Sequence, residues 1–438
     1  MINKIMLSLF SKIFVSIAGI FVYGLLARQL NANDFGIFTF YMSNIPILVL
    51  LLSAGLFSTS SRSLFTFSNR FYFVKNLFQI FSISTFFWIP LFVLGLFFFI
   101  DSQLSILARI AILVSAFCFA SLRIFSDYFR AKNNIFNFLL FNSPATGGGV
   151  LFWFFFTFYI LFSIALNPLI VDDIIILAAF SSLTVLLILI LSYYKKIKSF
   201  FDYSFANMLF FDNSFKNLLL SSINIMFVQI IFTFNSAYPS WIILYYLSTV
   251  EAGYFLALFK LCTFILSPLS IIDITTPQVI SRLYHNNSIL LQDFISILSF
   301  VRFMIGVLIA TILFIFSDQF LFLFYGEKFI SQSIYLKFMV CSFLPFILFG
   351  PTRQILIFTS NEKILSKLDI ILTPIFFVFL MIILKTNSLE TFIICYGFTN
   401  LIREFLYFIN VSRCTKLNSL PKFKKSFLKF DFKNVMNK

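Results

Sequence analysis

The chain has 438 residues, of which 60% are hydrophobic and only 11% are charged. A soluble domain usually carries about 25% charged residues, so this composition excludes an ordinary soluble protein. A net charge of +15 is typical of nucleic-acid binding in soluble proteins. In so apolar a chain it indicates instead that basic groups lie against anionic head groups of membrane lipids, and no nucleic-acid partner is expected.

About twelve apolar stretches are each long enough to cross a bilayer as a helix, which takes ~20 residues. In chain order they are predicted at Ile5–Ala27, Gly36–Ser58, Asn76–Ile100, Leu104–Arg123, Phe136–Phe162, Ile174–Tyr194, Asn217–Tyr238, Ala252–Ile272, Phe294–Phe316, Ser331–Gly350, Ile370–Leu384 and Thr391–Val411. Within the fifth stretch, Pro144 and Gly147–Gly149 are expected to weaken the helix. The sequence therefore predicts an all-α polytopic membrane protein.

Basic residues divide unequally between the two sides of these predicted spans. Outside the spans, every Lys and Arg except Arg28, Lys328 and Lys385 falls in the alternate loops of one side or in the tail. The positive-inside rule places that side in the cytoplasm. We therefore expect a multi-pass protein of a bacterial cytoplasmic (inner) membrane with both termini in the cytoplasm.

Two short segments of similar sequence indicate an internal repeat. The segment Arg28–Gly36 leads into the second span, and Tyr246–Tyr254 leads into the eighth. In each, a Leu stands six residues before a Gly and an acidic residue stands two before it. Superposing Gly36 on Gly253 also brings the second, third and sixth spans onto the eighth, ninth and twelfth, whereas the fourth and tenth match poorly.

An even number of spans in each half gives both halves the same orientation, so the repeat is a parallel pseudo-two-fold one. The expected domains are two six-helix bundles, a basic cytoplasmic linker and a basic cytoplasmic tail, at residues 1–194, 217–411, 195–216 and 412–438 respectively. Transporters commonly place the substrate site between such halves, near the midplane of the membrane.

The motif Ala27-Arg28-x-Leu30-x-x-x-Phe35-Gly36 resembles the signature after the first helix of Wzx-type polysaccharide flippases. The segments Glu251–Leu261 and Tyr325–Phe329 resemble two further motifs of this family, and the chain departs from its pattern at Asn31, where Gly normally follows the Leu. These flippases belong to the multidrug/oligosaccharidyl-lipid/polysaccharide (MOP) exporter superfamily. The resemblance implies a MATE-like fold. It also implies an undecaprenyl-pyrophosphate-linked oligosaccharide as cargo, such as an O-antigen unit for lipopolysaccharide biosynthesis. Polysaccharide polymerase and chain-length proteins are the implied partners.

Lys and Arg residues inside the spans are candidates for binding the cargo. An ionisable group in the membrane costs roughly 2.5–3.5 kcal/mol on insertion scales, so each such residue is expected to have a function. Lys12 begins a helical stripe of polar and small residues, and the repeat places a matching stripe on the seventh span. The predicted cargo contacts are Lys12, Ser16, Tyr23, Arg28, Gln229, Thr233, Lys260 and Arg302. Two alternatives stay open for the stripe: Lys12 snorkels to the inner surface, and the small residues pack against other helices.

The acidic residues separate the candidate functions. The predicted spans of the first half hold no carboxylate, whereas Asp273, Asp369 and Glu404 lie near the inner ends of spans in the second half. Unpaired bases suit an anionic cargo such as a pyrophosphate. The three acids are candidates for coupling to an ion gradient. Arg403 beside Glu404 is interpreted as a structural pair.

The flippase hypothesis has two alternatives. One is a multidrug or metabolite antiporter of the same superfamily, which is disfavoured because such a protein would be expected to bury a carboxylate in its first half. The other is a membrane-embedded polysaccharide polymerase or ligase, for which the predicted outer loops, such as 101–103 and 385–390, are short. The chain carries no P-loop, HExxH or GxSxG motif and no CxxC pair, so no catalytic residue, cofactor or metal is expected.

Overall fold

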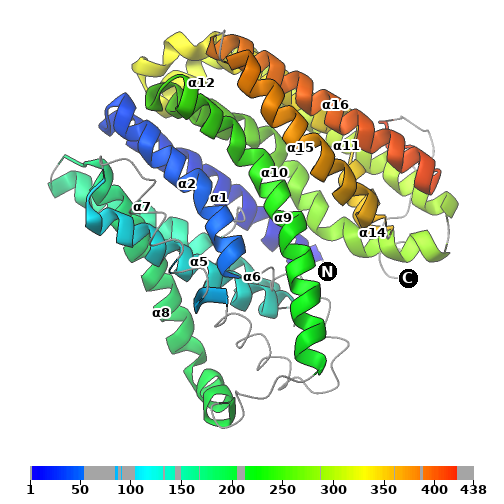
Figure 1. Cartoon of the computed structure of the whole chain (residues 1–438), viewed down its shortest axis with the longest axis horizontal. Coiled ribbons are helices and arrows are strands. Elements are labelled where there is room, and N and C mark those ends of the chain that lie inside the picture. The colour runs from blue at the N-terminus through cyan, green and yellow to red at the C-terminus, as the bar shows by residue number, and fades with distance from the viewer. Residues whose placement is uncertain are drawn as a thin grey trace. The chain divides into compact units, whose positions relative to one another are not determined.

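The computed structural model describes residues 2–53, 84–86, 90, 104–131, 134–143, 149–166, 168–204, 213–286, 288–359, 361–384 and 388–421. All regular secondary structure in these residues is helical (Figure 1). This confirms the prediction of an all-α chain. The predicted third span, Asn76–Ile100, lies almost wholly outside the described residues.

Eight helical stretches among the described residues are long and apolar enough to cross a membrane. They are Ala32–Leu52, Ile106–Ser126, Val171–Tyr194, Thr249–Leu266, Leu290–Ile315, Glu327–Phe358, Glu362–Leu384 and Leu389–Thr415. Two shorter apolar helices span Ile13–Gln29 and Val150–Leu166. The chain is therefore a multi-pass membrane protein, as the sequence predicts.

The chain folds as two compact units. The first consists of Met1–Val22 and Gln29–Ala237, and the second of Tyr23–Arg28 and Tyr238–Lys438. Helices α1 (Ile2–Gln29) and α9 (Asn213–Tyr246) therefore each contribute residues to both units. The domain limits expected from the sequence stay a prediction, and α8 and α9 extend into the stretch expected to be a linker.

In the first unit, the central helix α5 (Ile106–Ala131) packs along α8 (Val171–Ser204) and also contacts α2 (Ala32–Leu52). The short helix α6 (Ile135–Phe141) lies against α5, and α7 (Val150–Leu166) packs on α8. Aromatic side chains fill these contacts. The rings of Phe119 and Phe152, both buried, meet edge to face with their centroids 5.0 Å apart.

The predicted fifth span, Phe136–Phe162, is divided in the structure. It forms two helices, α6 and α7, and the chain between them leaves the helical conformation at Asn142. Gly149, just before α7, has a φ of +82°, which only glycine adopts without strain. The sequence predicted one span weakened at Pro144 and Gly147–Gly149, and the structure has separate helices on either side of that stretch, which itself lies mostly outside the described residues.

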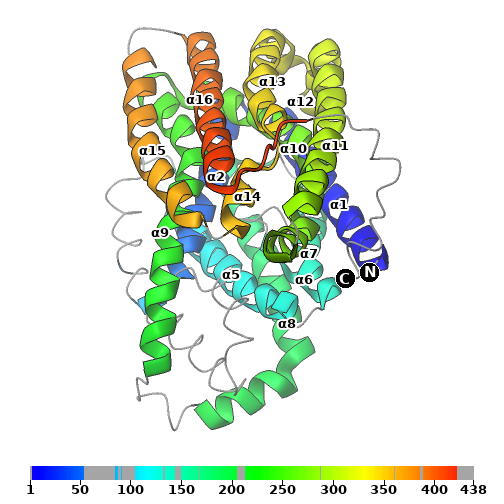
Figure 2. The ribbon, with the colours of Figure 1, turned by 90° about the vertical axis from the view of Figure 1, so that its right-hand side faces the viewer.

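The second unit begins with α10 (Thr249–Asn286), α11 (Ser288–Ile315), α12 (Ser317–Tyr325) and the 3-10 helix η3 (Glu327–Gln332). Helices α13 (Ser333–Leu348), α14 (Thr352–Phe358), α15 (Glu362–Leu384) and α16 (Leu389–Thr415) follow. Helix α13 packs against α11 and α16, and α15 lies beside α16 (Figure 2). The short helix α14 contacts α10, α15 and α16, so it is surrounded by longer helices.

The same start signal opens a helix in each half of the sequence repeat. Asn31 caps α2, because its side-chain oxygen accepts a hydrogen bond from the Asp34 N–H at 2.8 Å. At the matching position Ser248 caps α10, accepting from the Glu251 N–H at 3.1 Å. In both helices an acidic residue lies in the first turn, where its negative charge interacts favourably with the helix dipole. The capping role explains why Asn31 can stand where the family pattern has Gly.

Candidate functional site

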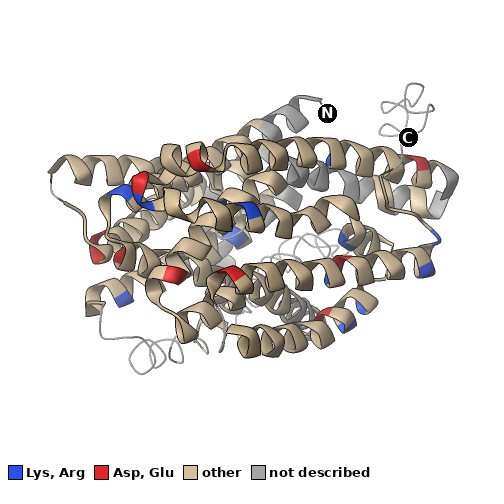
Figure 3. Ribbon diagram, turned by 90° about the horizontal axis from the view of Figure 1, so that it is seen from above, with Lys and Arg blue, Asp and Glu red and all other residues tan. Residues whose placement is uncertain are grey.

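Charged side chains are few along the helices, so each buried one is informative (Figure 3). In the second unit the cationic Nζ of Lys260, on α10, lies 5.3 Å from the ring centroid of Tyr23, at the end of α1. Tyr23 is buried. The ring face offers an attractive but weak partner for an ammonium, worth about 0.5–2 kcal/mol. The structure thus brings together two of the predicted cargo contacts.

Aromatic rings, not carboxylates, are the described neighbours of the Lys260 ammonium. Tyr325 uses its hydroxyl to donate to the Ala257 carbonyl at 3.1 Å, one turn before Lys260. Thr263 likewise turns its hydroxyl to the Lys260 carbonyl at 2.6 Å. Among the described residues no carboxylate lies within ion-pairing distance of the Lys260 ammonium. A half-buried amine without a carboxylate partner attracts an anion.

Arg28 has a different environment, although it was also predicted to contact cargo. Its guanidinium donates to the backbone carbonyls of Phe322 at 3.0 Å and Leu323 at 2.5 Å, near the end of α12. Cationic side chains commonly satisfy the carbonyls that a helix leaves unpaired at its end. Next to this contact, Gly24 lies so close to α12 that an added Cβ would be 2.1 Å from the Phe324 carbonyl oxygen. Arg28 therefore has a structural task in the second unit.

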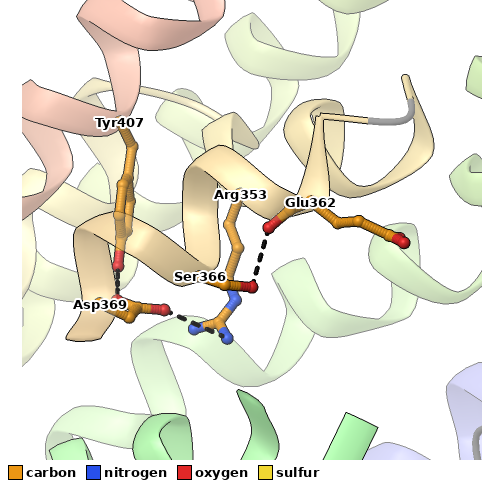
Figure 4. A network of polar contacts seen from close by, with 5 residues as sticks. All are labelled: Arg353, Glu362, Ser366, Asp369 and Tyr407. Carbon is orange, nitrogen blue, oxygen red and sulfur yellow. Dashed lines mark hydrogen bonds and ion pairs between the residues drawn. The ribbon is translucent and has the colours of Figure 1, made fainter. Parts of the chain in front are cut away.

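A second group of charges lies on α11, α14, α15 and α16. Its side chains are three arginines and two carboxylates with their hydroxyl partners, and we call it the arginine network: Arg302, Thr352, Arg353, Asp369, Arg403, Glu404 and Tyr407. Asp369, which is 1% exposed, accepts a hydrogen bond from the Tyr407 hydroxyl (Figure 4). Arg353 lies 3.9 Å from the other Asp369 oxygen (Figure 4).

Glu404 forms the other acidic centre of the arginine network. The Thr352 hydroxyl donates to its carboxylate at 3.0 Å, and the guanidinium groups of all three arginines lie near it. Arg403 also lies over the Phe376 ring, with 5.3 Å between the guanidinium carbon and the ring centroid. The sequence predicted an Arg403–Glu404 pair, and the structure shows a wider network in which every arginine has a carboxylate nearby.

Sequence reasoning missed Arg353, which it placed in a cytoplasmic loop. The structure places it on α14, just after the break at Gly350 and Pro351 that ends α13. Gly350 has a φ of +73°, and after this turn α14 packs against α15 and α16. A Gly-Pro pair inside an apolar stretch, followed directly by an Arg, was the available signal.

The remaining predicted site residues are not assembled into one constellation by any described contact. Ser16 on α1 and Gln229 and Thr233 on α9 are half-buried. Lys12 and Asp273 lie within α1 and α10, but their side chains are outside the described part of the structure. Their cargo-binding and coupling roles stay predictions. Within the described residues there is no group of three or more His, Cys, Asp and Glu side chains that could hold a metal ion.

No protein-family model matches the chain, and no curated protein matches its sequence. Among solved structures, it is similar to lipid II flippase MurJ in an inward closed conformation, with a TM-score of 0.69, 14% identity, and coverage of 93% of this chain and 87% of that chain. It is also similar to an inward-facing multidrug resistance MATE family transporter of the MOP superfamily, with a TM-score of 0.61, 16% identity, and coverage of 92% and 94%.

An outward-facing multidrug resistance MATE family transporter of the same superfamily gives a TM-score of 0.60, 14% identity, and coverage of 95% of each chain. These likenesses extend over nearly the whole chain, and at such low identity they define the fold. The protein therefore has the polytopic fold shared by MATE transporters and MurJ, which confirms the fold expected from the sequence.

Proposed function

We propose that this protein is a flippase that moves an undecaprenyl-pyrophosphate-linked oligosaccharide from the cytoplasmic to the periplasmic leaflet of a bacterial inner membrane. The oligosaccharide would be a repeat unit of O-antigen or a similar surface polysaccharide. The flipped unit would pass to polysaccharide polymerase and chain-length proteins. No bond is made or broken by the flippase itself.

The observation that carries this proposal is the Lys260 ammonium, held over Tyr23 without a carboxylate partner among the described residues. An unpaired cation at membrane depth costs free energy unless it has a use. A pyrophosphate supplies the missing counter-charge and several acceptor oxygens. The fold shared with a lipid II flippase supports the same class of cargo, a lipid with a charged head.

In the proposed cycle the head group enters from the cytoplasm and its charge is offset by Lys260, with Lys12 as a second cation on the predicted polar stripe. The protein then changes by alternating access to an outward-open state, as transporters with internal repeats do. Release follows when water and ions compete for the pyrophosphate. Asp369 and Glu404 are the proposed sites of ion coupling in the described region, and Asp273 is a third.

A multidrug antiporter is the second candidate, because two of the similar structures are multidrug resistance MATE transporters. A cationic drug requires an available carboxylate in its site. Among the described residues of the second unit, the buried carboxylates Asp369 and Glu404 already have partners: Asp369 has Arg353 and Tyr407, and Glu404 has Thr352. The unpaired group is a lysine, which repels a cation. This charge difference favours the flippase.

The test uses purified protein in proteoliposomes loaded with fluorescent undecaprenyl-pyrophosphate-linked oligosaccharide. Movement between leaflets is followed by the access of an added glycosidase to the sugar. We expect wild-type protein to expose the inner-leaflet pool and Lys260→Gln to do so much more slowly. Ethidium efflux, measured in parallel, should be absent. Drug efflux without movement of the lipid-linked sugar would establish the antiporter and refute the flippase.

A further inference from the structure

The chain that follows α16 folds back onto the second unit, at the end predicted to face the cytoplasm. Lys416 ends α16 in the left-handed conformation, with a φ of +58°, and turns the chain out of the helix. We call residues 417–420, which come next, the strap. Leu417 of the strap is buried in one apolar cluster with Phe294 of α11 and Ile355 of α14. The strap therefore begins in the core that these helices share.

A glutamine on α11 binds the strap as a neighbouring β-strand would. The Gln292 side-chain oxygen accepts a hydrogen bond from the Asn418 N–H at 2.7 Å, and its amide nitrogen donates to the Asn418 carbonyl at 2.9 Å. One side chain thereby satisfies both backbone groups of a strap residue. The Asn418 side chain in turn accepts from the Leu420 N–H at 2.9 Å, which fixes the conformation of the strap.

The strap also contacts the junction between α13 and α14. The buried Ser419 hydroxyl donates to the Phe349 carbonyl at 2.8 Å, at the end of α13. Gly350 follows and has no side chain to keep the strap away. An added Cβ there would lie 2.4 Å from the Ser419 carbonyl oxygen and 2.6 Å from the hydroxyl oxygen of Ser299 on α11. The strap, α11 and the junction therefore meet at Gly350.

Helix α14, which begins at this junction, carries a charged residue of the arginine network. It packs on α10, α15 and α16, and it places Arg353 3.9 Å from the Asp369 carboxylate. The strap adds a link between the junction and α11, because Ser419 binds the first and Gln292 lies on the second. A motion that separates α11 from the junction must therefore break the contacts of the strap with one of them.

The strap has the features of a segment that opens locally. Asn418 and Leu420 are half-buried, so the hydrogen bonds with Gln292 lie near the surface. Segments of this kind open at a lower free energy than the helices around them. Beneath the strap, Gly350 and Pro351 can act as a hinge, because the glycine adopts a φ of +73° and the proline has no N–H to continue a helix.

We propose that the strap is a releasable lock on the α13–α14 junction. Docked, it holds α14 in place, with Arg353 beside Asp369. Released, it lets α14 pivot at the junction when this end of the second unit opens. The lock rests on the proposed function, since such an opening belongs to alternating access, and it adds a controlling step to that cycle.

Thiol labelling tests local release without requiring transport. Ser419→Cys places a thiol beneath the docked strap, and the natural Cys262, buried in α10 of the same unit, reports opening of the helical core. Purified protein reacts with a maleimide in detergent, and mass spectrometry gives each rate relative to that in denatured protein. We expect the introduced thiol to react at least about tenfold faster than Cys262, because local opening requires less free energy. Equal rates would overturn the lock.

Adding Gln292→Leu to this protein removes both hydrogen bonds to the strap and should raise the labelling rate of the introduced thiol by about fivefold or more. The rate for Cys262 should stay the same. The matched control is Gln319→Leu at an exposed position of α12, which should change neither rate. An unchanged rate at position 419 in the Gln292→Leu protein would also overturn the proposal, since the glutamine would not be holding the strap.

Transport shows whether release belongs to the cycle. Gln292→Cys and Asn418→Cys, in a protein whose natural cysteines are replaced by serine, are joined by a short bis-methanethiosulfonate reagent that a reductant removes. We expect the joined protein to stop flipping the lipid-linked oligosaccharide and to resume after reduction. The control keeps the natural Cys414 and adds only Asn418→Cys, so the reagent joins the strap to its own helix and flipping should continue.

The outcomes separate this lock from the proposed function. Normal flipping by the joined protein would refute the lock and leave the flippase standing, because the strap would then be a static contact. If wild-type and reduced proteins move no cargo, the flippase is refuted, and the two labelling rates alone decide whether the strap releases.

Discussion

Two basic regions of the second unit differ in what their cations contact. In the arginine network, Arg353 lies beside Asp369, and Glu404 has Thr352 and three guanidinium groups near it. Lys260, among the described residues, has the face of Tyr23 as its cation partner, with 5.3 Å from Nζ to the ring centroid. The first arrangement is internally compensated and holds helices together. In the second, the positive charge of Lys260 has no carboxylate partner among the described residues. This lack of a partner indicates where an anion binds.

Removing one charge from each region should give the largest difference in stability between the two. Asp369→Leu leaves Arg353 without its carboxylate, and such losses cost about 3–5 kcal/mol; because Arg353 is 26% exposed, we expect a value near the lower limit. Lys260→Met removes a cation that forms no ion pair with any described residue, so stability should stay the same or rise. Thermal unfolding of the purified variants in detergent measures both. Similar losses of stability would contradict the comparison.

For the flipping rate, in contrast to stability, the larger effect is expected from the loss of Lys260. Lys260→Gln removes a charge-assisted contact worth about 1.5–3 kcal/mol, which corresponds to a roughly 10- to 100-fold slower flipping rate. Lys260→Arg keeps the charge and should retain most of the rate. As a control, Arg28→Gln removes a cation that only backbone carbonyls of α12 are seen to bind, and it should lower the amount of folded protein but not the rate per folded molecule. A normal rate in Lys260→Gln would exclude this lysine from cargo binding.

Arg28 sharpens the comparison because it is a cation bound by carbonyls rather than by a carboxylate. Its contact with α12 depends on the close approach at Gly24, where an added Cβ would lie 2.1 Å from the Phe324 carbonyl oxygen. Gly24→Ala should therefore destabilise the protein by about 1–3 kcal/mol. Gly19→Ala on the same helix meets only ordinary contact with Trp153 and gains helix propensity. The melting temperatures of this matched pair decide; equal values would show that the contact at Gly24 is loose.

The smallest expected effects concern the two rings that lie under cations. Tyr23→Leu removes the ring beneath Lys260 and should slow flipping a few-fold, because a cation–π contact is worth about 0.5–2 kcal/mol. Phe376→Leu removes the ring beneath Arg403 and should lower stability by a similar energy without changing the rate per folded molecule. A transport defect in Phe376→Leu as large as that in Tyr23→Leu would contradict the claim that only the region around Lys260 contacts the cargo.

Patterns that act locally along the chain could be predicted from the sequence. The long apolar stretches predicted helices and a polytopic fold, and the repeat predicted two equivalent helix starts, which the Asn31 and Ser248 caps share. The isolated base at Lys260 also stood out, because an ionisable group far inside an apolar stretch needs a reason.

Features that depend on which helices become neighbours could not be predicted. Arg353 looked like a loop cation until the Gly350–Pro351 break turned α14 toward Asp369. Arg28 looked available for cargo, but its partners are backbone carbonyls nearly 300 residues away in the chain, which no local pattern marks. The docking of the strap has the same origin, since Gln292 binds a backbone that lies 126 residues further along the chain.

The affinity of purified protein for undecaprenyl pyrophosphate is the most direct test of whether Lys260 is an unpaired cation that receives the head group. Native mass spectrometry or thermophoresis would compare wild-type protein with Lys260→Met, with undecaprenol as the uncharged reference lipid. We expect the variant to bind the pyrophosphate lipid at least about tenfold more weakly and undecaprenol equally well. Equal affinity of both proteins for undecaprenyl pyrophosphate would contradict the account.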